Sequence, residues 1–368
     1  MKLSTSQRKL YWLSAVLLAL TLVIVAAWGL LGAPDSPASV QPAAPESQAD
    51  AGTAQPWPSD EPAATPQPLG EQATLRTVAY YQDNYGYLVP VTRTIPAEEG
   101  VAKATLSLMV SSAYNDMEAA RLGLRTVLPE GTDIDLDVVD GTARIDLGEQ
   151  VLQMADAQAE ANMVSAVVQT LTEFPTVERV EFLVGGKKRD RLTFGTEISG
   201  TFERGQLNLE SLNAAADVAA MGAISLYFPG EGGNLIVPVT RMVYGPSDLN
   251  TAVLELTKGP STQSPLEGVL PPGCGLIGVS VKDGVATLNF TKDFINIAQQ
   301  SDGGRVALRA LVLTCTQFEG VDSVAIQVEG QPYDPGQATL AVPTFVNDAA
   351  SLTQQYISTQ TASILDVD

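Results

Sequence analysis

Val89-Pro90-Val91-Thr92-Arg93 recurs letter for letter as Val237-Pro238-Val239-Thr240-Arg241, 148 residues further along the chain. Segments downstream recur at nearly the same distance: Val127-Leu128-Pro129 at Val269, the Asp140-Gly141 pair at Asp283, and Thr172–Val177 at Thr316. A distance this steady indicates two copies of one domain that differ in loop length, not a short solenoid repeat.

Each copy opens with two β-rich runs joined by turn residues. Val78–Tyr81 leads into Leu88–Val91, and Ser225–Phe228 leads into Leu235–Val239. Short runs of this kind predict a β-hairpin. Because proline cannot donate a hydrogen bond to a neighbouring strand, we expect the proline-containing strand to be an edge of its sheet. We also expect these two edges to offer backbone groups to a protein partner.

A first helix follows the hairpin in each copy. Leu249, Val253 and Leu256 share one helical face, Asp248 supplies an N-cap oxygen and Gly259 ends the helix. The first copy has Val101–Val110 at the equivalent place.

A second helix carries an apolar stripe that recurs 144 residues later. The pairs are Val164 and Leu308, Val167 and Leu311, Val168 and Val312, Leu171 and Cys315, and Phe174 and Phe318. Spacing of this kind marks a face turned towards the core. We expect Phe174 and Phe318 to be equivalent core anchors.

The two helices enclose a second hairpin. Ile134–Val138 alternates with aspartates and turns at Asp140-Gly141, and Ile277–Val281 turns at Asp283-Gly284. Asp-Gly supplies the positive φ angles of a tight turn. A final strand, Val180–Val184 or Val324–Val328, completes a unit of the α+β class: a mostly antiparallel sheet with two helices packed on one face.

Several linked segments carry a family resemblance. They are Val237–Arg241 (VPVTR), Leu256–Pro260 (LTKGP), Val269–Gly273 (VLPPG), the Asp-Gly hairpin and Thr314–Gly330 (TCTQFEGVDSVAIQVEG). Their order resembles the GerMN domain, over residues 220–332 and, without the Lys-Gly-Pro, over residues 74–190.

The resemblance implies a fold similar to the ring-building motifs of secretion-system and sporulation-channel proteins. It also implies a role in sporulation, in assembling or stabilising an envelope complex between mother cell and forespore. Family members that are lipoproteins carry an acylated N-terminal cysteine, which this chain lacks.

The N-terminus predicts a membrane anchor. Lys2, Arg8 and Lys9 precede the uncharged stretch Leu10–Leu31, which is long enough to span a bilayer and longer than the apolar region of a signal peptide. The basic side chains face the cytoplasm, so we expect single-pass insertion in the cell membrane with the C-terminal domains outside. Cleavage as a signal peptide remains the alternative.

A Pro- and Ala-rich segment follows the anchor and reads as a tether. The expected organisation is a cytoplasmic N-terminus at 1–9, a transmembrane helix at 10–31, a linker at 32–72, GerMN-like domains at 73–205 and 206–346, and a tail at 347–368.

Composition argues against several classes of function. The 42 acidic residues outnumber the 21 basic ones, for a net charge of −21, which disfavours a nucleic-acid partner. The chain has no histidine, which removes Ser-His-Asp and Cys-His catalysis and the commonest metal ligand. We therefore expect no enzyme and no catalytic, cofactor-binding or metal-binding residues.

Three features have a functional and a structural interpretation. Cys274 and Cys315 either form a disulfide or remain free, and Cys315 replaces a core leucine. The aspartates at 133, 135, 137, 140 and 146 could form a calcium site or line a solvated strand face. The strand face is favoured, because they alternate along the strands and have no EF-hand spacing. The basic cluster Lys187–Arg191 contacts an anionic lipid or acidic partner, or is a solvated loop between the domains.

The leading hypothesis is a tethered, non-enzymatic assembly protein that binds protein partners and is able to oligomerise. The alternative is a module that binds cell-wall glycan or another envelope ligand, with Tyr80, Tyr81, Tyr85 and Tyr87 exposed to stack on sugars. A glycosidase ranks third, because no acid pair recurs in a setting that separates two pKa values.

Overall fold

The computed structural model describes residues 73–97, 100–210, 221–300, 304–333, 340–341 and 346–353. The chain divides into compact units at residues 1–67 and 68–368, and every described residue belongs to the second unit. The expected transmembrane segment Leu10–Leu31 and the linker 32–72 lie outside the described residues. Within the ranges given, no helix combines the length and apolarity needed to cross a membrane.

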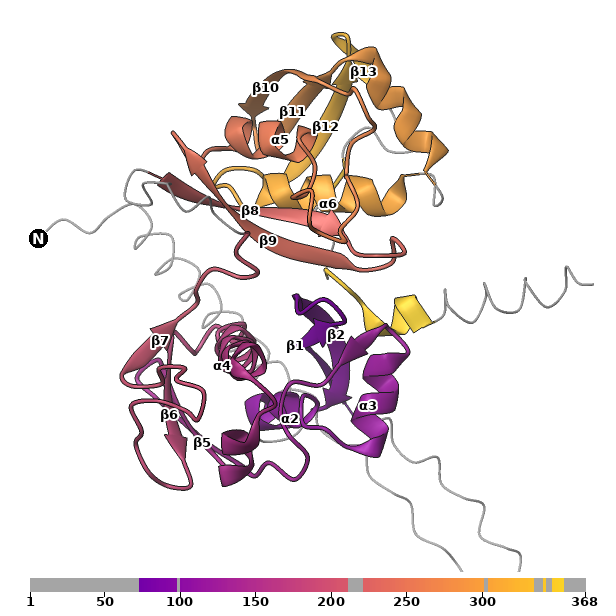
Figure 1. Ribbon diagram of the computed structural model, residues 1–368. Helices are drawn as coiled ribbons and strands as arrows, with labels where there is room; N and C mark the ends of the chain where they lie inside the picture. Colours follow the sequence, from indigo (N-terminus) through magenta and orange to yellow (C-terminus); the bar gives the residue numbers. More distant parts are fainter. Residues whose placement is uncertain are drawn as a thin grey trace, which may run out of the picture. The chain divides into compact units, whose positions relative to one another are not determined.

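The first repeat alternates hairpins and helices as the sequence predicts (Figure 1). Its elements are β1 (Thr74–Asp83), β2 (Leu88–Pro96), α2 (Val101–Ser107), α3 (Ala113–Ala120), β3 (Leu124–Arg125), β4 (Ile134–Val139), β5 (Thr142–Leu147), η1 (Glu149–Gln153), α4 (Ala157–Leu171), β6 (Arg179–Val184) and β7 (Thr201–Glu203).

In its described residues the second repeat has the same order without counterparts of α3 and β3, and it ends with one more strand, β14. Its elements are β8 (Met221–Pro229), β9 (Ile236–Tyr244), α5 (Leu249–Thr257), β10 (Leu276–Lys282), β11 (Val285–Phe290), η3 (Lys292–Gln299), α6 (Arg305–Thr316), β12 (Ser323–Val328), β13 (Gln331–Tyr333) and β14 (Leu340–Ala341).

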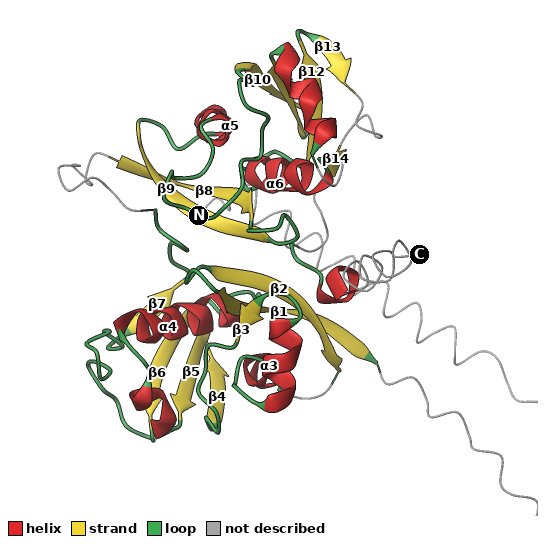
Figure 2. Ribbon diagram, turned by 45° about the vertical axis from the view of Figure 1, so that its right-hand side comes forward, coloured by secondary structure: helices red, strands yellow, loops and turns green. Residues whose placement is uncertain are grey.

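The strands of each repeat form two sheets, whereas the sequence pattern predicted one. In the first repeat β2-β1-β3 is separate from β4-β5-β6-β7, and in the second β8-β9 is separate from the sheet of β10 to β14. The second long helix, α4 or α6, contacts both sheets of its repeat (Figure 2). Ten of the fifteen residues of α4 are buried, so the helix needs cover on more than one side.

Most strand pairs are antiparallel, as expected, with one parallel pair in each repeat. The parallel pairs are β5 with β6 and β11 with β12. Each pair is joined through α4 or α6, because parallel neighbours need a crossover connection.

Equivalent residues hold equivalent positions in the two repeats. The backbone N–H of Tyr80 donates to the Thr170 hydroxyl at 3.2 Å, and that of Tyr227 donates to Thr314 at 3.1 Å. Asp140 and Asp283, the first residues of the Asp-Gly turns, have φ angles of 48° and 50°. The prediction of two tight hairpin turns is confirmed.

The apolar stripe of the second helix is buried, except at its last position. Val164 to Leu171 and Leu308 to Cys315 are at most 9 % exposed at the stripe positions. Phe174 and Phe318 follow the helix ends and are only half-buried against the core. Both therefore pack against the core at equivalent positions, as expected, but neither ring is as buried as the rest of the stripe.

The buried apolar residues of both repeats form one connected cluster. The sequence predicted a separate core for each copy, because each has its own helical stripe. The cores join because the first hairpins of the two repeats are buried against each other, as described below.

Candidate functional site

The two proline-containing strands face each other across the boundary between the repeats (Figure 1). Among the described strands, β2 is an edge of its sheet and β9 belongs to a two-stranded sheet, which confirms the edge prediction. Leu88–Thr92 and Ile236–Thr240 are buried along their whole length. The expectation that these edges are open to a partner protein is wrong, because each repeat covers the edge of the other.

Asn208 connects the two edges. Its side-chain oxygen accepts the backbone N–H of Leu88 at 2.8 Å, and its side-chain nitrogen donates to the Leu88 carbonyl at 2.8 Å and the Pro238 carbonyl at 2.7 Å. One amide therefore pairs with backbone groups of both repeats.

Asn347 does the same from the second repeat. Its oxygen accepts the N–H of Ile236 at 2.8 Å, and its nitrogen donates to the carbonyls of Ile236 and Pro90, both at 2.8 Å. Ile236 and Pro238 are the counterparts of Leu88 and Pro90. The two asparagines thus form a pseudo-twofold pair of clamps.

The backbone of the segments around these asparagines also forms hydrogen bonds with the next residues of each strand edge. The N–H of Thr92 donates to the Asn347 carbonyl at 2.7 Å, and that of Thr240 donates to the Leu207 carbonyl at 2.9 Å. Sequence reasoning missed both asparagines. Each follows an apolar residue, at Leu207-Asn208 and Val346-Asn347, but the same pair occurs at Leu249-Asn250 and Leu288-Asn289, so it does not identify them.

The arginine that ends the repeated motif pairs with carboxylates and lies near an aromatic ring in both repeats. Arg241 pairs with Glu210 at 2.6 Å and Glu255 at 3.2 Å, and its guanidinium lies 5.8 Å from the Phe228 ring centre. Arg93 lies 6.0 Å from the Tyr81 ring centre and 3.6 Å from Glu118. The cation–aromatic contact recurs, while the ion pairs are tighter in the second repeat.

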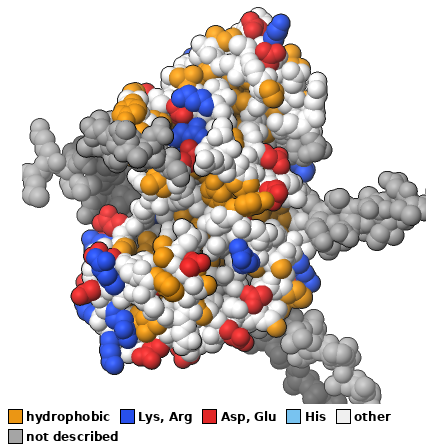
Figure 3. Space-filling model, in the orientation of Figure 1, with side chains coloured by type: hydrophobic (Ala, Val, Ile, Leu, Met, Phe, Trp, Pro, Cys, Tyr) orange, Lys and Arg blue, Asp and Glu red, His pale blue; other side chains and the backbone are white. Residues whose placement is uncertain are grey.

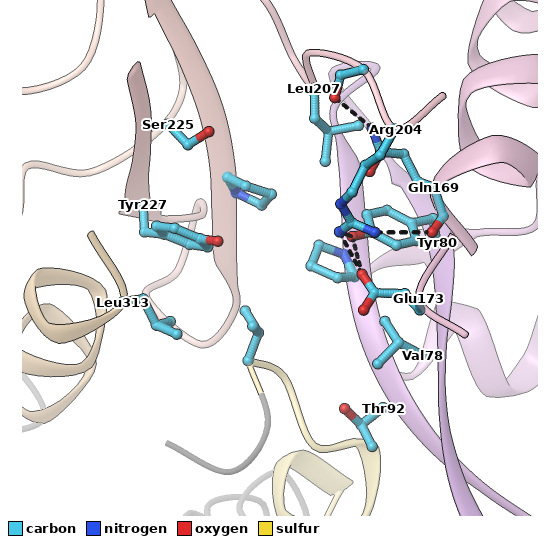
Figure 4. Close-up of a pocket in the computed structure, with 14 residues that line it drawn as sticks. Val78, Tyr80, Thr92, Gln169, Glu173, Arg204, Leu207, Ser225, Tyr227 and Leu313 are labelled. Carbon is cyan, nitrogen blue, oxygen red and sulfur yellow. Dashed lines mark hydrogen bonds and ion pairs between the residues drawn. The ribbon is translucent and has the colours of Figure 1, made fainter. Parts of the chain in front are cut away.

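A cavity of about 380 Å³ lies beside the clamps, between the repeats (Figure 4). Its lining includes three pairs of equivalent residues: Tyr80 with Tyr227, Pro90 with Pro238, and Leu207 with Val346. These aromatic, proline and aliphatic side chains share the wall almost equally with polar groups.

Among the described residues that line this cavity, the charged ones, Glu173 and Arg204, stand on one wall. Glu173 accepts hydrogen bonds from the Tyr80 hydroxyl at 2.8 Å and from Arg204 at 2.5 Å. The Arg204 guanidinium also donates to the Tyr80 hydroxyl at 2.8 Å (Figure 4). Burial, followed by the nearby Glu173 carboxylate, raises the pKa of Tyr80 above its usual range, so this hydroxyl stays protonated. Tyr227 faces the cavity from the other wall, and burial raises its pKa as well.

The tyrosines expected to stack on sugars are either buried or in contact with the second repeat. Tyr80 and Tyr81 are 3 % and 2 % exposed, so that expectation is wrong for them. Tyr85 is exposed and its hydroxyl donates to Glu231 at 2.7 Å, while the Tyr87 hydroxyl lies 3.0 Å from that of Ser264. Tyr85 and Tyr87 therefore contact the second repeat.

The other residues singled out in the sequence do not gather into a site. Cys274 and Cys315 are both free thiols, and both are buried. Asp133, Asp135, Asp137 and Asp140 are exposed, while Asp146 accepts the N–H of Gly186 at 3.0 Å. In the part of the chain that the structure describes, no three His, Cys, Asp or Glu side chains are placed to hold a metal ion.

The basic cluster Lys187–Arg191 lies inside the first repeat, between β6 and β7. It is thus not a loop between the two domains, as the sequence suggested, because β7 pairs with β6 after it.

Comparisons with known proteins agree with the repeat. The family model described as "Germane: Sporulation and spore germination" matches residues 78–190 and 225–334, more than half of the chain. The spore germination protein GerM of Bacillus subtilis is 29 % identical over 269 residues, which are 70 % of this chain and 73 % of GerM.

A solved structure extends the similarity to both repeats together. The tandem GerMN domains of the sporulation protein GerM from Bacillus subtilis match with a TM-score of 0.64 and 27 % identity, covering 75 % of this chain and 99 % of that structure. The chain therefore belongs to the Germane family of sporulation and spore-germination proteins, and it carries the GerMN domain as a tandem pair.

Proposed function

We propose that this protein acts in sporulation as a membrane-tethered, extracytoplasmic assembly protein that binds protein partners in an envelope complex. Support comes from the GerM-like tandem and from the sequence-based expectation of an anchor at Leu10–Leu31. In this proposal the protein acts by binding and not by turnover, because a chain without histidine lacks Ser-His-Asp and Cys-His catalysis.

The observation that carries the proposal is the closure of the inner edges. With β2 and β9 covered, we propose that an assembly partner uses the outer edges β4 and β10, each the first strand of the larger sheet in its repeat. Val139 on β4 is 57 % exposed and Val281 on β10 is 49 % exposed. Exposed edge strands with apolar side chains are suited to strand addition by another protein.

Substitution at these outer edges tests the proposal. Val139→Lys and Val281→Lys should lower spore formation in cells that carry the variant as their sole copy, with the protein level unchanged. Tyr244→Lys, at a residue that is 65 % exposed on β9, is the matched control and should keep normal spore formation. Normal spore formation by all three variants would refute assembly through these edges.

Topology is tested separately. Protease added to intact wall-stripped cells should digest residues 68–368 if the anchor places them outside. Protection until lysis would contradict the tethered, extracytoplasmic arrangement.

The cavity between the repeats supports a second candidate function, binding of a cell-wall or other envelope ligand. Its wall combines apolar side chains with a few convergent polar groups, Glu173, Arg204 and Tyr227. Sedimentation with purified peptidoglycan tests this function. Ser225→Trp, which places a large ring at the cavity wall, should abolish any binding that uses the cavity.

A further inference from the structure

The loop that joins β6 to β7 exposes an aromatic side chain at its tip. The N–H of Gly195 donates to the Leu192 carbonyl at 3.1 Å, and that of Leu192 to the Thr196 carbonyl at 2.9 Å. Leu192 is buried beneath this turn, whereas Phe194 is 47 % exposed. The turn therefore separates a buried apolar residue from an exposed one.

A buried carboxylate fixes the tip. Glu160 of α4 is fully buried, and its two oxygens accept the N–H groups of Phe194 and Thr196, both at 2.9 Å. A buried carboxylate is stable only with such partners, so the helix and the tip hold each other in place. Phe194 is thus presented by a fixed backbone.

Basic side chains flank the tip. Lys187, Lys188 and Arg191 are exposed, and only Lys188 has an ion pair in the described part of the chain, with Glu181. Residues 185–200 contain four basic and two acidic residues, in a chain whose net charge is −21. Figure 3 shows Lys and Arg side chains gathered at the lower left, over the β6–β7 part of the first repeat.

The second repeat provides an internal comparison. After β12 its chain turns at Glu329-Gly330 and has no basic residue through Tyr333. Tyr333 packs edge-on against Phe294, with the ring centres 5.4 Å apart. The exposed aromatic and its basic flank are therefore specific to the first repeat.

We propose that this loop, Gly185–Gly200, docks on an anionic lipid surface, with Phe194 inserted at the interface and Lys187, Lys188 and Arg191 near the phosphates. An aromatic ring with flanking basic side chains matches the chemistry of such a surface, because the ring enters the headgroup boundary while the ammonium and guanidinium groups stay beside the anionic headgroups. The proposal rests on the proposed function, since the tether supplies the nearby membrane.

The acidic remainder of the chain does not prevent this contact. Charges beyond about 10 Å are largely screened at 0.1 M salt, so the local cluster determines the interaction. Each basic residue near an anionic bilayer contributes about a fivefold gain in binding, so the three together contribute about a hundredfold gain.

A single tryptophan makes the contact measurable. All three tryptophans, Trp12, Trp28 and Trp57, lie before residue 68, and the unit 68–368 contains the whole connected core. The Phe194→Trp variant of that unit therefore has one tryptophan, at the loop tip. Tyr244→Trp, on β9 of the second repeat, is the matched control.

We expect the emission of the Phe194→Trp protein to shift to the blue with phosphatidylglycerol vesicles and to be quenched by brominated acyl chains. Phosphatidylcholine vesicles, 1 M salt, or replacement of Lys187, Lys188 and Arg191 by Gln should abolish the shift, while circular dichroism stays unchanged. The control tryptophan should not respond.

An unchanged spectrum with anionic vesicles, or an equal response to both lipids, would overturn the lipid proposal and leave an acidic protein as the partner. Because the assay uses no other protein and no anchor, its result is independent of the spore-formation and topology tests above.

Discussion

Asn208 and Asn347 make the same three hydrogen bonds from opposite sides of one boundary. On one side of the boundary, each side chain accepts the backbone N–H of a residue and donates to the carbonyl of the same residue. Across the boundary, each donates to the carbonyl of a motif proline. The carbonyl of each motif proline remains a hydrogen-bond acceptor, and the side-chain amide of an asparagine across the boundary donates to it.

Truncating either asparagine should destabilise the protein. Asn347→Ala should lower the free energy of unfolding by about 2–4 kcal/mol, because the side chain is 2 % exposed and its partners become unsatisfied. Asn208→Ala should cost about 1–3 kcal/mol, because the residue is less buried. Asn296→Ala, at an exposed position, is the control for chemical denaturation. Equal stability of all three variants would contradict the clamp.

The two motif arginines should differ in their contribution. Arg241→Met leaves the carboxylate of Glu210 without its ion pair with Arg241, while Glu255 keeps its pair with Lys258, so we expect a loss of about 3 kcal/mol. Arg93→Met should cost about 1 kcal/mol, because its ion pair is long at 3.6 Å. Thermal or denaturant unfolding of the two variants checks the order, and a larger effect at Arg93 would refute it.

Phe174→Ala and Phe318→Ala should each cost about 1–3 kcal/mol, less than a fully buried phenylalanine, because both rings are half-buried. Phe294→Ala should cost about 3–5 kcal/mol, because that ring is fully buried and stacks on Phe290. Denaturant titration compares the three. The ranking fails if either half-buried position proves as costly as Phe294.

Both thiols should be unreactive while the protein is folded. Burial raises the pKa of Cys315 to about 12, and burial with the nearby Asp293 raises that of Cys274 to about 11. At pH 8 an aromatic disulfide reagent should therefore react at least about a hundredfold more slowly than after unfolding. Rapid modification of the native protein would show that one thiol is accessible.

The same thiols give a pH dependence of defined sign. Each raised pKa stabilises the fold fully below about pH 8.5, the pKa of an unfolded cysteine, and this contribution falls as the pH rises towards the folded values. Replacing both by Ser should flatten the decline in stability between pH 8 and pH 11, measured by denaturant titration. If the stability of the variant declined with the same slope, the pH dependence would belong to groups other than the two thiols.

The fragment 206–346 tests how far the second repeat folds alone. It lacks Asn347, which pairs with both backbone groups of Ile236. The longer fragment 206–353 should therefore unfold at a higher denaturant concentration. Identical midpoints would show that the asparagine matters only in the presence of the first repeat.

The elements that sequence periodicity defines were predictable, and the long-range pairings were not. Alternation and Asp-Gly turns located β4 and β5, and i, i+3, i+4 spacing located the stripe of α4, because these signals are local. The partition of strands between two sheets, and the burial of β2 against β9, depend on how helices cover sheets, which periodicity does not report.

At the boundary site, the role of the prolines could be predicted from the sequence and that of the asparagines could not. Pro90 and Pro238 restrict their own backbone, so a single residue shows that the strand is an edge. Asn208 and Asn347 act on strands more than 100 residues away in one or both of their contacts, and nothing in their immediate neighbours indicates a partner. The tyrosines misled for a similar reason, because a strand tyrosine has the same local pattern whether it is buried or exposed.

Because the two repeats belong to one chain, equivalent positions around the cavity are able to carry different residues. In a symmetric homodimer both subunits contribute the same residues to the interface. A glutamate on one wall of the cavity would then require a glutamate at the equivalent position on the other wall. Here Glu173 has Gln317 as its counterpart, and Gln169 has Leu313. Joined in one chain, the two halves are free to diverge while their backbones keep the twofold match, and a paired surface gains a charged side and a neutral side.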